Sequence, residues 1–113
     1  MSDPAPVIGG GGRHAEAHRR IEEEIRREKA AALGRAGERL DEALREVHER
    51  ERRLDTATEP RERAHLFEEY ERAVVRARAA RHALLIQREA IGLRNHRAVD
   101  QLFPEPPRRR RDA

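Results

Sequence analysis

The stretch "LDTATEPRE", residues 54–62, decides the fold, because it interrupts a long helical pattern with the only interior proline, Pro60. Proline breaks a helix from inside but suits the first helical turn, where its missing N–H costs nothing. Thr58 has the residue type of an N-cap, and acidic residues follow it where the helix dipole favours negative charge. The stretch therefore predicts a turn at residues 56–59 between two helices.

Before this turn, residues 14–56 have the apolar spacing of one long helix. Apolar residues recur in steps of three and four or their sums, which places them on one face. These residues are Ile21, Ile25, Ala32, Ala36, Leu40, Ala43, Val47 and Leu54. On the other faces, acids precede arginines by four residues, as in Glu16–Arg20 and Glu22–Arg26. That order stabilises a helix and keeps its other faces hydrated.

After the turn, residues 59–102 carry two apolar rows with a period of seven, which is typical of a helix that packs along a seam. One row runs through Tyr70, Ala77, Leu84, Ile91 and Ala98, and the other includes Phe67, Val74 and Leu102. The sequence predicts an interface formed by Tyr70, Val74, Leu84, Ile91 and Leu102.

Arg81 and Arg88 stand at seam positions where apolar residues are expected. One interpretation is that they meet an acidic partner or fix which helices pair. The other is that their aliphatic stems pack while their charged heads reach solvent.

These patterns predict an all-α fold, a long antiparallel two-helix hairpin that resembles a coiled coil. The apolar surplus on the second helix predicts a second copy or another protein against it, with a homodimeric four-helix bundle as the preferred assembly. The alternative is a three-helix bundle in which the first helix breaks at Gly34 and Gly37, since each helical glycine costs about 1 kcal/mol relative to alanine.

Composition sets the limits of the domain. Of the 113 residues, 42% are charged and only 3% aromatic, so the core is expected to be thin. Residues 1–12 combine prolines with four consecutive glycines and predict a disordered arm. Residues 104–113 form a Pro/Arg-rich tail that is also expected to be disordered, which leaves residues 13–103 for the helical hairpin.

Two histidine-containing patterns raise the hypothesis of a metal site at the open end of the hairpin. His14 and His18 are one helical turn apart, and so are His96 and Asp100. If the second helix continued to its predicted end, antiparallel pairing would bring these four groups together, and imidazole and carboxylate are ligands of zinc. The alternative is that the histidines are ordinary residues near helix ends.

The tail ends in Arg108, Arg109, Arg110 and Arg111. Four arginines can contact nucleic-acid phosphates or an acidic protein surface. The run is short, however, and no aromatic residue interleaves with it to stack on bases. A solubilising tail is the alternative.

Catalysis finds little support in the sequence. Cysteine is absent, the only serine lies in the arm, and the glycine run follows no strand, so no phosphate-binding loop is indicated. The chain has no apolar run of membrane-spanning length and no secretory signal. We therefore expect a soluble, cytoplasmic, non-enzymatic interaction or scaffold module without a cofactor. Nucleic-acid association through the tail and metal binding are the alternatives.

Overall fold

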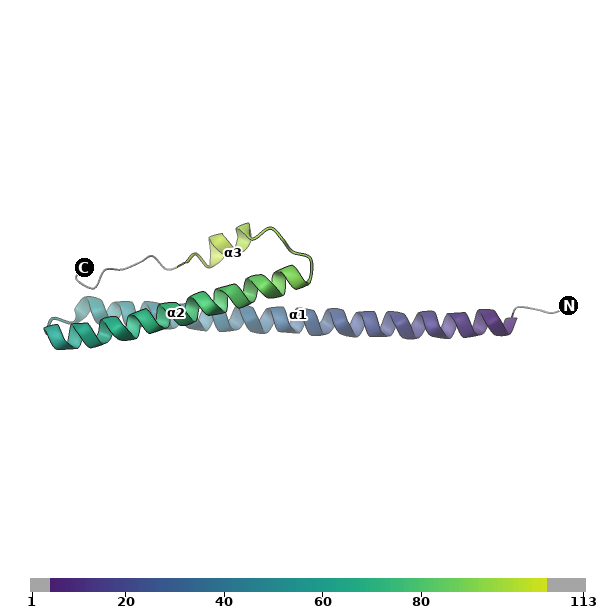
Figure 1. The fold of residues 1–113 in the computed structure, drawn as a ribbon, viewed down its shortest axis with the longest axis horizontal. Helices are drawn as coiled ribbons and strands as arrows, with labels where there is room; N and C mark the ends of the chain where they lie inside the picture. The colour runs from purple at the N-terminus through teal and green to yellow at the C-terminus, as the bar shows by residue number, and fades with distance from the viewer. Residues whose placement is uncertain (1–4, 106–113) are drawn as a thin grey trace. The chain divides into compact units, whose positions relative to one another are not determined.

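The computed structural model describes residues 5–105, and every regular element in that part of the chain is a helix. The helices are α1 (Ala5–Thr56), α2 (Pro60–Ala90) and α3 (Arg97–Leu102), which Figure 1 labels. The chain divides into an N-terminal unit that ends at Ala31 and a second unit that begins at Ala32. The predicted all-α class is confirmed.

The start of α1 differs from the prediction. Residues 1–12 were expected to be a disordered arm, but the structure has helix from Ala5 onward, and the first four residues lie outside the described part. Pro6 is compatible with this start because it falls in the first helical turn, where no N–H donor is needed.

The turn between α1 and α2 lies where the sequence predicts it, with a different cap. Glu59, not Thr58, is the N-cap, and its carboxylate accepts a hydrogen bond from the backbone N–H of Glu62 at 2.8 Å. The Arg63 guanidinium donates to the carbonyl oxygens of Leu54 and Ala57 at 2.7 and 2.8 Å. These bonds satisfy carbonyl groups that the end of α1 leaves without helical partners.

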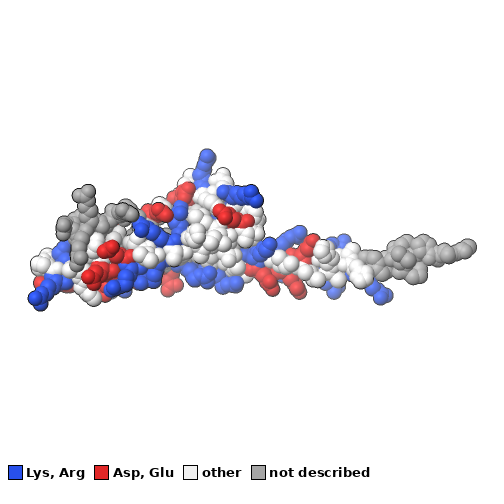
Figure 2. Space-filling model, viewed as in Figure 1, with Lys and Arg blue, Asp and Glu red and all other residues white. Residues whose placement is uncertain are grey.

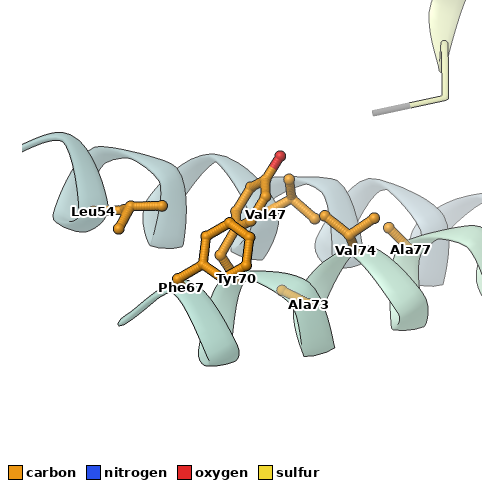
Figure 3. Close-up of a cluster of buried hydrophobic side chains, with 7 residues drawn as sticks. All are labelled: Val47, Leu54, Phe67, Tyr70, Ala73, Val74 and Ala77. Atoms are coloured by element: carbon orange, nitrogen blue, oxygen red, sulfur yellow. The ribbon is translucent and has the colours of Figure 1, made fainter. Parts of the chain in front are cut away.

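Within the second unit, the C-terminal part of α1 packs against α2 through a cluster of buried side chains (Figure 3). The cluster consists of Val47, Leu54, Phe67, Tyr70, Ala73, Val74 and Ala77. The cluster combines the small side chains of Ala73 and Ala77 with the rings of Phe67 and Tyr70, whose centroids are 6.4 Å apart.

Ion pairs across the hairpin accompany this packing. Arg50 is 3.1 Å from Glu69 on α2 and 3.6 Å from Glu46 on α1. Arg76 on α2 contacts the same Glu46 at 2.5 Å. Because these contacts link the helices at defined positions, they favour the observed antiparallel register over slipped ones.

The second helix does not continue to residue 102, so this part of the fold prediction is wrong. α2 ends at Ala90, and Gly92 has a positive φ of 90°. The N–H of Leu93 bonds to the Arg88 carbonyl at 2.9 Å, and that of Gly92 to the Glu89 carbonyl at 3.0 Å. This pair of bonds is the Schellman motif, which ends a helix at a left-handed glycine.

After Gly92 the chain reverses, and α3 lies beside α2 (Figure 1). Val99 is buried together with Ala36 and Leu40 of α1 and Leu84 of α2. Phe103, just after α3, packs against the same cluster. The second unit is therefore a hairpin whose open side is covered by a short third helix.

The alternative break in α1 is also not observed. α1 is continuous through Gly34 and Gly37, and a Cβ atom added at either position would meet nothing within 4 Å. The third helix arises from a chain reversal at Gly92, far from these glycines.

Candidate interaction surfaces

The predicted interface residues fall into two groups. Tyr70, Val74 and Leu84 are 2%, 6% and 6% exposed, because the seam of α2 is already used by contacts within the second unit. In the single chain these three side chains therefore belong to the core of the second unit. Ile91 and Leu102 are 37% and 72% exposed and remain accessible.

The proposed metal site rested on a second helix that continued past residue 100, and that premise is wrong. After the reversal, Asp100 pairs with Arg81 of α2. His96 lies 3.1 Å from Glu89 and accepts a 3.4 Å contact from the Arg88 guanidinium. These two side chains have partners within the second unit.

The other two predicted ligands belong to the N-terminal unit. His18 is 3.0 Å from Glu22, one turn further along the same helix, and His14 is exposed. Over residues 5–105, no group of three or more His, Asp or Glu side chains is arranged to hold a metal ion. Two of the four residues thus belong to each unit, and the site that would combine them stays a prediction.

Arg81 and Arg88 have a role that the sequence did not indicate. Arg81 is 14% exposed in its side chain and donates to the Phe103 carbonyl at 3.1 Å, besides pairing with Asp100. Arg88 donates to the Asn95 carbonyl at 2.9 Å. Both arginines hold the returning chain against α2. A helix end predicted at Gly92 would have indicated the chain reversal that brings these partners to the two arginines.

The four tail arginines, Arg108 to Arg111, lie outside the described residues. Figure 2 shows charges of both signs interspersed over the face of the second unit that it presents. This view agrees with the small net charge of +3 spread over many acidic and basic residues.

Two rows that contain large apolar side chains stay exposed. The first, the N-terminal row, consists of Ile21 and Ile25, which are 53% and 44% exposed and lie one turn apart on α1. Every residue from 12 to 31 is exposed, so within the N-terminal unit these described side chains pack into no core.

The second, the outer row, lies on the side of α2 that faces away from the core. It consists of Val75, Ala79, His82 and Ile86, all exposed, with Val75 at 63% and Ile86 at 50%. The outward positions of α1 in the same unit are instead polar, as at Arg35, Glu38, Arg39 and Glu42. Between Ala32 and Thr56, α1 has no exposed large apolar side chain, whereas α2 has Val75 and Ile86.

A cavity of about 210 Å³ lies where Val47, Tyr70 and Leu102 approach one another, with His48, Glu51 and Glu105 among its lining residues. Its volume falls below the ~300–1,000 Å³ of typical small-molecule sites.

No helix in the described residues has the length and apolar character needed to cross a membrane. No protein-family model matches this chain, and no curated protein or solved structure is significantly similar to it.

Proposed function

We propose that this chain is a non-enzymatic helical interaction module whose N-terminal helical segment binds another protein. The observation that carries the proposal is the N-terminal row, two large aliphatic side chains about half exposed on one helical face. A row of anchors one turn apart is how an amphipathic helix docks into the apolar groove of a partner.

Ion pairs along the same segment support this reading. Glu16 and Arg20 are 3.8 Å apart, and Glu22 and Arg26 are 4.0 Å apart, each pair one turn apart. Such pairs contribute a few tenths of a kcal/mol each and favour helix without tertiary contacts. The segment is then helical before binding, which lowers the entropy that association must overcome.

The test compares two variants in affinity capture from extracts of the source organism. Ile21→Gln with Ile25→Gln removes the row while keeping good helix formers. The matched control, Glu23→Gln with Arg27→Gln, changes the opposite face and preserves net charge. A captured protein is then purified and titrated by calorimetry against each variant.

We expect wild type and control to bind the captured protein with equal affinity. The row variant should bind about tenfold or more weakly, because it lacks the two aliphatic side chains that the partner's groove would bury. Equal binding by the row variant, or equal loss in the control, would overturn the proposal.

A further inference from the structure

The outer row of α2 has the spacing of a coiled-coil seam. Val75, Ala79, His82 and Ile86 follow one another in steps of four, three and four, so they form one narrow stripe. The buried side chains of α2, among them Tyr70, Ala77 and Leu84, occupy the other side of the helix. The stripe is therefore a second seam, separate from the one that pairs with α1.

This seam is complementary to itself when one copy is reversed. Val75 and Ile86 lie equally far from the midpoint between Ala80 and Arg81, and so do Ala79 and His82. In an antiparallel pair of α2 helices, Val75 of one copy thus meets Ile86 of the other. The small Ala79 meets the larger His82, as close helix packing requires.

The charges at the two ends of the row decide the direction. Arg72 and Glu89 continue the same stripe, both are exposed, and they too are equidistant from its midpoint. Antiparallel pairing places each Arg72 opposite Glu89 of the second copy. Parallel pairing would instead align Arg72 with Arg72 and Glu89 with Glu89, and like charges that face each other are destabilising.

We propose that the outer row is the interface of an antiparallel homodimer, with a second copy of this chain as its occupant. This inference goes beyond the N-terminal row and uses a separate surface. The paired stretch from Arg72 to Glu89 spans about 27 Å of helix. So short an overlap lies at the small end of specific interfaces, and we expect a dissociation constant in the micromolar range.

Cysteine cross-linking tests the pairing directly, because the protein has no cysteine of its own. Val75→Cys and Ile86→Cys are made as separate variants with tags of different length and are oxidised alone and in equimolar mixture. A disulfide needs Cα atoms within about 7 Å, so only residues in the same layer of the seam link. The antiparallel dimer gives a covalent heterodimer in the mixture, with little product from either variant alone.

Efficient cross-linking of each variant alone would establish a parallel arrangement and overturn the inference. So would the absence of cross-links at protein concentrations where wild type sediments as a dimer, since another face would then be in use. A monomeric wild type would also overturn it, while leaving binding through Ile21 and Ile25 intact as a separate result.

A charge exchange provides the second readout. Arg72→Glu and Glu89→Arg should each weaken association about fivefold or more, since either change removes both symmetry-related ion pairs of the dimer, and each partly exposed pair contributes a fraction of a kcal/mol. The combination of both changes restores the opposite charges and should recover most of the affinity. Glu89 also contacts His96 within the chain, so Glu89→Arg alone could weaken association by disturbing the fold. Recovery of affinity in the double variant would show that the two charges meet across the interface. Failure to recover would contradict the antiparallel register.

Discussion

At the scale of single residues, Val99 and Leu102 show what the sequence could not reveal. Leu102 belongs to the period-seven pattern and is 72% exposed, so it takes no part in the core of the single chain. Val99 lies outside that pattern and is 2% exposed, buried against Ala36, Leu40 and Leu84. Periodicity assigns faces only along one continuous helix, and both residues follow the chain reversal at Gly92.

This contrast predicts different effects of truncating the two side chains. Val99→Ala should lower the free energy of unfolding by about 2 kcal/mol, because it removes buried methyl groups and leaves a cavity. Leu102→Ala serves as the matched control and should change it by less than about 0.5 kcal/mol, as is usual at exposed positions. Urea denaturation followed by circular dichroism measures both. Equal effects would contradict the docking of α3 through Val99.

At the scale of elements, the local signal of a proline placed one helix end correctly, whereas apolar periodicity extended the second helix too far. Pro60 fixed the turn between α1 and α2 to within a residue, because a proline tolerates only the first turn of a helix. Gly92 is an equally local signal, but the apolar rows on either side of it favoured a continuous helix. The structure shows that the glycine stop prevails, since Val99 and Phe103 gain buried contacts by turning back.

Substituting glycines tests this account of the elements. Gly92→Ala should destabilise the protein by about 1–2 kcal/mol, the cost of placing a Cβ atom in the left-handed region. Gly34→Ala is the control, because that glycine lies inside α1 with open space around its Cα. It should stabilise the protein by about 0.5–1 kcal/mol through helix propensity.

Thermal unfolding measures both effects: the melting temperature should fall for Gly92→Ala and rise for Gly34→Ala. Destabilisation by both substitutions would show that Gly34 also has a packing role. A neutral effect at Gly92 would show that the backbone there does not require positive φ.

At the scale of the whole molecule, composition and periodicity were enough to predict an all-helical hairpin with a thin core. The metal-site and seam-interface hypotheses stay predictions, although the continuous second helix on which they were drawn is not observed. The chain reverses after Gly92, and the contacts of Arg81 and Arg88 hold the returning segment against α2. The sequence could not distinguish the exposed rows from core positions, because apolar residues that line a core and those that line an interface have the same helical spacing.

The central claim is that the outer row of α2 mediates self-association, and sedimentation equilibrium of the wild-type protein tests it most directly. Wild type should dimerise with a micromolar dissociation constant. Val75→Gln with Ile86→Gln should raise that constant about tenfold or more, because the apolar layers of the interface are lost. Glu38→Gln with Arg39→Gln, on the polar outward face of α1, should leave it unchanged. A wild type that stays monomeric, or a Val75/Ile86 variant that associates as strongly as wild type, would contradict the account.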